Sequence, residues 1–327
     1  MKIIDLHCDT LLWSVMKPED PLEDPVRQIT VEKLIRGGAL AQCFALFVPT
    51  DGQGSMAEQE EKCYGFFRKL AENFEEAMRK HADVLLQARN AAEIRRNAAE
   101  IRRNAAAGKI SAVLTLEDGT FVAGQMSRIE EAASLGARAL ALTWNTENCF
   151  GYPNSDDREA HLLPLKLFGR EAVEYMNDLG MIADVSHLNE GGFWDVAKIS
   201  RKPFVATHSC ANELVKHKRN LTDDQIRAVA ESGGVIGINF YPPFVSPDRE
   251  NTTIDTVVRQ ARYLVNVGGE DAVALGSDFD GMAEGTLDFG GFSDYAGYPA
   301  IAEALSDALG SRSAEKICSL NALRVLE

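Results

Sequence analysis

Eight short apolar segments alternate with helix-forming segments along nearly the whole chain, and this alternation is the feature that most constrains the fold. The apolar segments begin near Ile3, Leu40, Ile110, Ala137, Met181, Pro203, Gly234 and Ala272. The segment at 39–48 is almost continuously apolar, which is typical of a parallel strand buried on both faces. Eight strands that alternate with helices are the number found in a (β/α)8 barrel. We therefore predict an α/β fold, the TIM-type (β/α)8 barrel.

The length of the chain, 327 residues, is ordinary for one such barrel with insertions. We expect a single domain over residues 1–327 that ends in two helices over about 295–326. The sequence Arg-Asn-Ala-Ala-Glu-Ile-Arg occurs at 89–95 and again at 96–102. Because seven residues make two helical turns, the repeat predicts a charged helical extension over about 89–106. Each copy holds one Ile, so a solvated helix is favoured over a coiled-coil partner helix.

The charge of the chain argues against several partners. The formal net charge is −15, from 49 acidic and 34 basic residues, and it would repel nucleic acid phosphates and anionic membrane surfaces. The N-terminus begins at once with a strand, without a basic and apolar leader pattern, and no long apolar run predicts a membrane span. Six cysteines without a CxxC pair are typical of reduced core residues. We expect a cytoplasmic protein that binds neither nucleic acid nor membrane.

Ionisable side chains stand at the ends of the predicted strands. These residues are His7, Asp9, Glu117, His187, His208 and Asp278. His7 and Asp9 are two positions apart in an extended segment, so their side chains point the same way. The carboxyl ends of barrel strands form the face on which barrel enzymes build their sites. We therefore expect all six side chains to meet on that face.

This set of side chains predicts a metal centre. Imidazole nitrogen and carboxylate oxygen are ligands that suit zinc and related ions. Three histidines and up to three carboxylates exceed the needs of one tetrahedral ion, and a carboxylate can bridge two ions held close together. A water shared by two divalent cations loses a proton near neutral pH and becomes a nucleophile. The chemistry that follows is that of a metal-dependent hydrolase with a binuclear centre.

Seven short motifs match those of a known family in the same order. They are Asp5-Leu-His-Cys-Asp9, Leu116-Glu-Asp-Gly119, Asp184-Val-Ser-His187, Thr207-His-Ser209, Arg219-Asn-Leu-Thr-Asp-Asp224, Gly237-Ile-Asn-Phe240 and Gly276-Ser-Asp-Phe-Asp-Gly281. On these motifs the sequence resembles the membrane dipeptidase (renal dipeptidase) family, peptidase family M19, which has soluble bacterial members. The resemblance implies a barrel metallopeptidase that hydrolyses dipeptides, including those with a D-residue on the C-terminal side, and that forms a homodimer.

The resemblance also implies two zinc ions. His7 and Asp9 would hold one ion, and His187 and His208 would hold the other. Glu117 would bridge the two ions and so take part in catalysis. The attacking group would be a hydroxide that bridges the metals. The same ligands also bind Mn²⁺ or Co²⁺, so the sequence does not fix the metal.

Further residues take roles that the resemblance implies. Asp278 would shuttle a proton from the attacking water to the leaving amine. Arg219 would pair with the free carboxylate of the dipeptide, because a planar guanidinium can bind both carboxylate oxygens. Tyr241 and Phe244 are candidates for the aromatic lining of the substrate pocket.

The chain departs from the family pattern at one position. Where the family usually has a histidine, in the context Leu-Thr-His, this chain has Trp144. Indole has one N–H donor and no charge, so three readings are open. Trp144 would donate in place of the histidine, narrow the pocket for another substrate, or mark weakened dipeptidase activity.

Two other functions stay open at this point. A metallohydrolase on the same barrel could act on another amide, a lactone or a phosphoester. A non-catalytic metal-binding homologue would keep the barrel without the activity, and Trp144 is the feature that favours it. The intact ligand set and Asp278 argue against a loss of catalysis.

Overall fold

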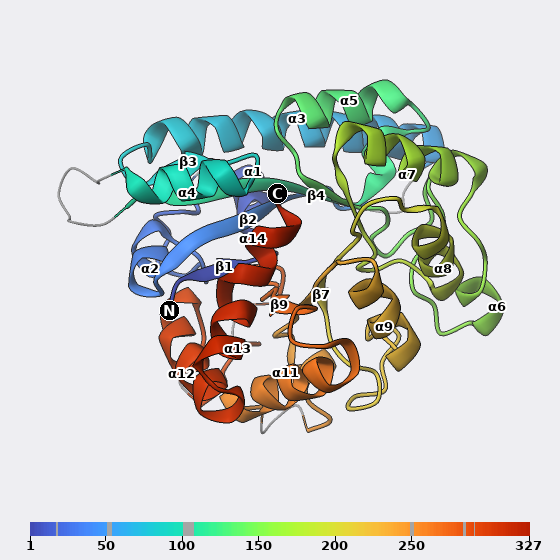
Figure 1. Cartoon of the computed structure of the whole chain (residues 1–327). Coiled ribbons are helices and arrows are strands. Elements are labelled where there is room, and N and C mark those ends of the chain that lie inside the picture. The colour runs from blue at the N-terminus through green and yellow to red at the C-terminus, as the bar shows by residue number, and fades with distance from the viewer. Residues whose placement is uncertain (18, 51–53, 101–107, 249–251, 284–285, 291) are drawn as a thin grey trace.

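The computed structural model describes residues 1–17, 19–50, 54–100, 108–248, 252–283, 286–290 and 292–327 (Figure 1). Nine parallel strands form one sheet. They are β1 (Ile3–Asp5), β2 (Ala39–Phe47), β3 (Leu85–Gln87), β4 (Ile110–Glu117), β5 (Ala139–Ala141), β6 (Ile182–Asp184), β7 (Ala206–Ser209), β8 (Ile236–Ile238) and β9 (Val273–Leu275). Eight of them follow the order β6-β5-β4-β2-β1-β9-β8-β7, and β3 pairs with β4 beside this path. The prediction of a (β/α)8 barrel is confirmed.

Strands β6 and β7 stand at the two ends of this order, and a short contact between them closes the barrel. Asp184 of β6 forms an isolated parallel bridge with Val205, which lies just before β7. The Val185 amide donates to the Val205 carbonyl over 2.8 Å, and the Val205 amide donates to the Ala183 carbonyl over 3.0 Å. The seam between β6 and β7 is therefore held by few backbone hydrogen bonds.

Helices surround the strands (Figure 1). They are α1 (Trp13–Met16), α2 (Val31–Arg36), α3 (Met56–Lys80), α4 (Ala91–Ala99), α5 (Met126–Ser134), α6 (Arg158–His161), α7 (Leu167–Leu179), α8 (Glu190–Ile199), α9 (Asp223–Glu231), α10 (Pro242–Val245), α11 (Ile254–Gly268), α12 (Tyr298–Leu309), α13 (Ser311–Glu315) and α14 (Asn321–Val325). Short 3-10 turns lie at Thr10–Leu12, Gly119–Val122 and Tyr295–Gly297, and a π-helical turn at Lys316–Leu320 joins α13 to α14. The two helices predicted over about 295–326 correspond to α12, α13 and α14 with the short turns beside them.

The core has two parts, as the alternation of strand side chains requires. On the outer face, Phe44 and Leu114 belong to the same buried cluster as Phe67 of α3. On the opposite face, Cys43 and Val113 belong to a second cluster that includes Leu323 of α14. The second set lines the interior of the barrel, as expected for a packed barrel core.

The helix at the repeat is shorter than the predicted helix over about 89–106. Helix α4 ends at Ala99, and Glu100 is extended, with φ −74° and ψ 123°. The Lys109 amide donates to the Asn97 carbonyl (3.1 Å) and the Glu100 carbonyl (3.0 Å), so the chain turns back there toward β4. The rest of the predicted extension, residues 101–106, lies outside the described part of the chain.

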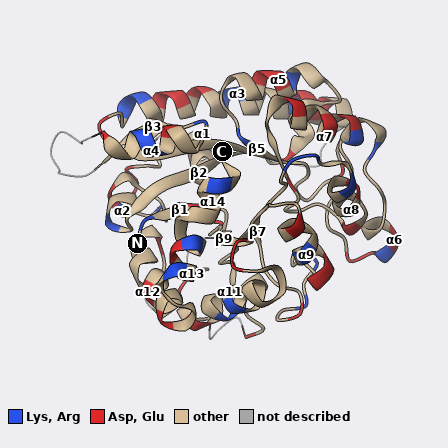
Figure 2. Cartoon of the chain, in the orientation of Figure 1, with Lys and Arg blue, Asp and Glu red and all other residues tan. Residues whose placement is uncertain are grey.

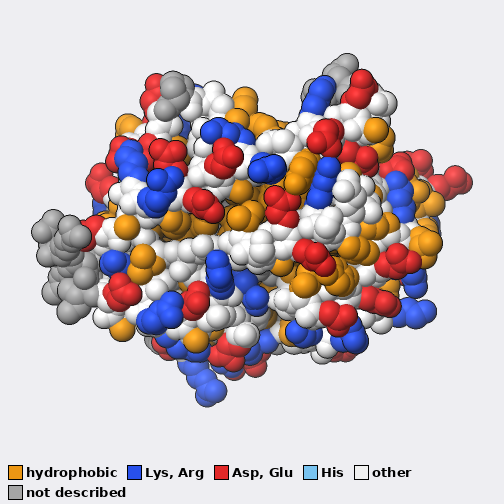
Figure 3. Space-filling view, turned by 90° about the horizontal axis from the view of Figure 1, so that it is seen from above, with side chains coloured by type: hydrophobic (Ala, Val, Ile, Leu, Met, Phe, Trp, Pro, Cys, Tyr) orange, Lys and Arg blue, Asp and Glu red, His pale blue; other side chains and the backbone are white. Residues whose placement is uncertain are grey.

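Charged side chains lie mainly on the outer helices and loops (Figure 2). In the view from above, acidic and basic side chains are interspersed with hydrophobic ones across the surface (Figure 3). All six cysteines are within the described ranges and none of them forms a disulfide. Among the described residues, no helix has the length and apolarity that crossing a bilayer requires.

Candidate metal centre

The six side chains predicted at strand ends come together at the carboxyl ends of five barrel strands. His7 and Asp9 follow β1, Glu117 is the last residue of β4, His187 follows β6, His208 lies within β7, and Asp278 follows β9. His187 and Asp278 have positive φ angles of 67° and 66°. Residues other than glycine rarely adopt this conformation, and it persists where the surrounding structure enforces it. The backbone therefore turns sharply at both positions and directs the two side chains to the common site.

The carboxylate of Glu117 lies at the middle of the group. Its Oε2 is 3.3 Å from Nε2 of His7, and its Oε1 is 2.9 Å from Nε2 of His187. The same Oε1 is 3.7 Å from Nε2 of His208. One oxygen of Glu117 thus faces the histidine after β1, and the other faces the histidines after β6 and within β7.

His7 also joins a second set of oxygen ligands. Its Nε2 is 3.6 Å from Oδ2 of Asp9 and 3.7 Å from Oδ1 of Asp278. Two groups of potential ligands, each with all ligand atoms within 4.8 Å of one another, therefore share His7: one with Glu117 and His208, the other with Asp9 and Asp278. The rings of His7 and His208 stack with their centroids 3.8 Å apart.

The unpaired atoms of this group fit divalent cations. Nε2 of His7 and Oδ1 of Asp9 are buried, and within the described part of the chain they have no hydrogen-bond partner. Nε2 of His187 lies 3.0 Å from Nε2 of His208. Two neutral imidazoles this close together can both offer a ring nitrogen to the same cation. Nitrogen and carboxylate ligands in this number suit zinc and its neighbours.

Burial and charge set the protonation of these groups. Burial lowers the pKa of His187 and His208 well below the usual value, and positive neighbours add to the effect, so both rings are neutral and able to coordinate a metal. Burial together with Asp9 raises the pKa of Glu117 to about 8. For His7, burial lowers the pKa, but the carboxylates of Glu117 and Asp9 outweigh it and raise the pKa well above its usual value. Without a cation, the site therefore holds protons among its carboxylates and His7.

Arg219 lies beside the histidines, in the loop between β7 and α9. It is 5% exposed, and its Nη2 donates to the carbonyl of His208 over 3.3 Å. Its guanidinium lies 5.5 Å from the ring centroid of Phe244. Its Nε has no hydrogen-bond partner among the described residues. A cavity of about 60 Å³, lined by Arg219 and His161 among others, lies next to it.

The three aromatic residues that were predicted to contact the substrate lie on two sides of the metal centre. Trp144 is half-buried; its ring centroid is 4.9 Å from that of Phe47 and 6.5 Å from that of His187. Tyr241 packs edge-on against Phe244, with centroids 4.8 Å apart. Trp144 therefore lies on the His187 side of the centre, whereas Phe244 lies beside Arg219 and Tyr241 packs against Phe244.

The structure adds residues that the sequence did not single out. Asn239 donates from Nδ2 to Oδ2 of Asp278 over 3.0 Å. Thr207 contacts Nδ1 of His208 over 2.9 Å and donates from its hydroxyl to the carboxylate of Asp184. Each of these residues falls within a family motif, which is the signal that could have pointed to them.

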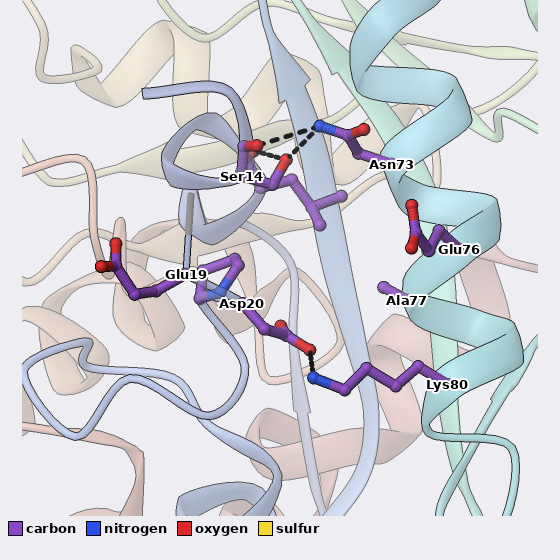
Figure 4. A pocket seen from close by; sticks show the side chains of 9 residues that line it. Ser14, Glu19, Asp20, Asn73, Glu76, Ala77 and Lys80 are labelled. Carbon is purple, nitrogen blue, oxygen red and sulfur yellow. Dashed lines mark hydrogen bonds and ion pairs between the residues drawn. The ribbon is translucent and has the colours of Figure 1, made fainter. Parts of the chain in front are cut away.

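A third acidic group lies apart from the centre, beside a cavity of about 270 Å³ (Figure 4). Asp20, Glu23 and His81 place their ligand atoms within 4.8 Å of one another. Nζ of Lys80 already lies 2.7 Å from Asp20 and 2.8 Å from Glu23. The ammonium group therefore occupies the position that a metal ion would need.

A (β/α)8 barrel whose strand ends carry three histidines and three carboxylates is the architecture of a metal-dependent hydrolase. Comparison with protein families gives the particular family. The family model described as "Membrane dipeptidase (Peptidase family M19)" matches residues 1–327. The chain belongs to this family of metallopeptidases, and the resemblance seen in its motifs is confirmed.

The chain is also similar to individual proteins. A Klebsiella pneumoniae protein encoded in the pqqA 5′ region is 39% identical over 62% of this chain and 76% of its own length. A Schizosaccharomyces pombe protein named as a dipeptidase is 35% identical over 66% of this chain, which spans about half (52%) of that relative. A metallopeptidase from Rhodobacter sphaeroides, solved with a phosphinate mimic of the dipeptide L-Ala-D-Ala, is 27% identical over 100% of this chain and 98% of its own, with a TM-score of 0.87.

Proposed function

We propose that this protein is a binuclear zinc dipeptidase whose substrates include dipeptides with a C-terminal D-residue. The observation that carries the proposal is the position of Glu117, whose two oxygens face His7 on one side and His187 on the other. A carboxylate with histidines on both sides is suited to bridging two ions. The L-Ala-D-Ala mimic bound by the Rhodobacter protein supports the substrate class.

In this proposal, His7 and Asp9 would hold one ion, His187 and His208 would hold the other, and Glu117 would be a ligand shared by both. Two bound divalent ions would supply a nucleophile at neutral pH by acidifying water and would polarise the peptide carbonyl. The chain supplies the rigid frame, because these side chains are almost completely buried. Residues 1–327 would act as one domain, and Mn²⁺ or Co²⁺ could take the place of zinc.

Asp278 is the proposed proton shuttle. Its side chain is 17% exposed, the largest value among the six residues, so it is open to substrate while His208 is fully buried. Burial raises its pKa, with Asp9 adding to the effect and His7 opposing it. A carboxylate with a raised pKa can accept a proton from water and return it to the leaving amine. Its Oδ1 faces His7, and its Oδ2 is held by Asn239.

Arg219 is proposed to bind the free carboxylate of the dipeptide. Burial lowers its pKa, but a guanidinium remains charged in proteins. A buried cation at a fixed distance from the reacting bond would select substrates in which the carboxylate lies one residue away, and so would limit the enzyme to dipeptides. Tyr241 and Phe244 would line this end of the pocket, and Trp144 would form an apolar wall on the other.

A panel of substrates tests the proposal. The zinc-loaded protein should release amino acids from L-L and L-D dipeptides and should act only weakly on lactones, simple amides and phosphoesters. Asp278→Asn serves as the control, because it should keep the metal ions and lose about 10²- to 10⁴-fold in kcat. Turnover of a lactone or phosphoester in preference to every dipeptide would favour the alternative of another metallohydrolase. Tight binding of two ions with no hydrolysis of any substrate would favour a non-catalytic homologue.

A further inference from the structure

We infer that Thr207 and Asp184 are positioning residues that hold His208 in the tautomer with its proton on Nδ1, which leaves Nε2 free for a metal ion. This inference rests on the proposed function, since it concerns one ligand of the proposed centre. It assigns a role to a buried hydroxyl and a buried carboxylate that are not among the proposed metal ligands.

The contacts form a chain of three side chains. Nδ1 of His208 lies 2.9 Å from Oγ1 of Thr207. That hydroxyl donates to Oδ2 of Asp184. The other oxygen of Asp184, Oδ1, accepts the backbone amides of Thr207 (3.0 Å) and Ser186 (2.9 Å). All three side chains are buried, so water does not compete for these bonds.

The direction of these hydrogen bonds fixes the tautomer of His208. A carboxylate is only an acceptor, so the single hydroxyl proton of Thr207 is directed to Asp184. Thr207 can then only accept from the ring of His208, and Nδ1 must carry the proton. The opposite nitrogen, Nε2, is left with its lone pair, and this is the atom that faces Glu117 and His187. A ligand histidine whose other nitrogen donates a hydrogen bond, here to a hydroxyl that a carboxylate orients, is better oriented and a stronger base.

The neighbouring histidine lacks this support. Nδ1 of His187 faces Oδ1 of Asn145 at 3.3 Å, and Asn145 is exposed. The carboxylate of Asp184 also binds the Thr207 amide across the seam between β6 and β7, where backbone pairing is sparse. Closure of the barrel and orientation of His208 therefore depend on the same side chain.

The test compares three variants in metal binding. Thr207→Val keeps the shape of the side chain and removes the hydroxyl, whereas Thr207→Ser keeps the hydroxyl. Asp184→Asn replaces a carboxylate oxygen with an amide N–H₂ that can donate to Thr207, so that the Thr207 hydroxyl can donate to His208 instead. The metal-free proteins are titrated with Zn²⁺ in competition with a chromophoric chelator. We expect Thr207→Val and Asp184→Asn to bind one of two ions about 10- to 100-fold more weakly and Thr207→Ser to bind both within about threefold of wild type.

Wild-type affinity for both ions in Thr207→Val and Asp184→Asn would overturn the inference, and so would an equal loss in Thr207→Ser. A wild-type protein that binds fewer than two ions would contradict the proposed function instead. Should the variants fail to fold, the wild-type protein still decides the matter by ¹⁵N NMR, with the His208 signals assigned through the spectrum of His208→Gln. We expect a proton on Nδ1 of His208 in the metal-free protein, and a proton on Nε2 would overturn the inference.

Discussion

The side-chain amide of Asn239 donates to Oδ2 of Asp278 over 3.0 Å. The same Nδ2 lies 3.5 Å from the carbonyl of His208, and Oδ1 of Asn239 accepts the amide of Tyr241 over 2.6 Å. Asn239 thus has fixed partners on three sides and holds one oxygen of Asp278 in place. The other oxygen, Oδ1, is left facing His7 and the centre.

Removal of the Asn239 side-chain amide should slow catalysis while the metal ions stay bound. In Asn239→Ala, Asp278 can rotate away from the reacting bond, and we expect kcat to fall about 10- to 100-fold with little change in KM. Steady-state kinetics and metal analysis on the same sample measure this. Asn97→Ala is a matched control, because Asn97 is also buried but contacts Ser111 at β4, and it should leave kcat unchanged. An unchanged kcat in Asn239→Ala would contradict the role of the amide.

Arg219 should matter only for substrates with a free carboxylate. The charge-assisted bonds that it would form are worth about 1.5–3 kcal/mol, so Arg219→Ala should lower kcat/KM for a dipeptide about 10- to 150-fold. The same variant should hydrolyse the corresponding dipeptide amide as slowly as the wild type does. Equal losses on the dipeptide and on its amide would show that Arg219 supports the fold around His208 rather than the substrate.

Trp144 should act as an apolar wall. It packs against Phe47 beside His187, and its indole forms no hydrogen bond to the described part of the chain. We expect Trp144→Ala to lower kcat/KM about 10- to 100-fold for dipeptides with bulky apolar side chains and much less for glycyl dipeptides. Trp144→Phe should retain most of the activity. A large loss in Trp144→Phe would instead indicate that the indole N–H takes part in catalysis.

A buried carboxylate next to the centre should give the protein a defined pH dependence. Burial raises the pKa of Asp118 to about 6, against which its hydrogen bonds with Thr120 and Asn148 act. The folded state then binds more protons than the unfolded state between about pH 4 and pH 6, so stability falls as the pH rises through this range. Oδ2 of Asp118 has no partner among the described residues, and an amide nitrogen could take its place.

We therefore expect metal-free Asp118→Asn to be about 1–3 kcal/mol more stable than the wild type at pH 7 and equally stable at pH 4. Urea unfolding at the two pH values measures the difference. Asp307→Asn, on the exposed side of α12, should change stability at neither pH. A variant that is no more stable at pH 7 would show that the charge of Asp118 carries no cost in the fold.

The barrel and the gathering of the six residues could be predicted because both follow from local patterns. Apolar runs locate the strands, and parallel strands bring their carboxyl ends to one face, so His7 and Glu117 meet although they are far apart in sequence. Strand β3 was missed because its three residues, Leu85–Gln87, show no run long enough to be distinguished from the end of α3. The end of α4 at Ala99 was missed because hydrogen bonds from Lys109 determine it, beyond the repeat itself.

The family motifs contain the supporting residues of the centre, but the sequence does not reveal what these residues contact. Asn239, Thr207 and Asp184 gain their roles from partners on other strands, and an amide, a hydroxyl or a carboxylate at a strand end is common without such a role. Only the register between β6 and β7 shows that Asp184 reaches Thr207. The orientation of Trp144 also depends on its contact with Phe47, which the sequence does not reveal.

The number of ions needed for hydrolysis tests the binuclear centre most directly. Metal-free protein is titrated with Zn²⁺ while bound zinc and the release of amino acids from L-Ala-D-Ala are followed together. We expect two ions per chain, with activity that develops as the second ion binds, and a loss of this second step in Glu117→Gln. Full activity with one ion per chain, or two bound ions without any release of amino acids, would contradict the proposal.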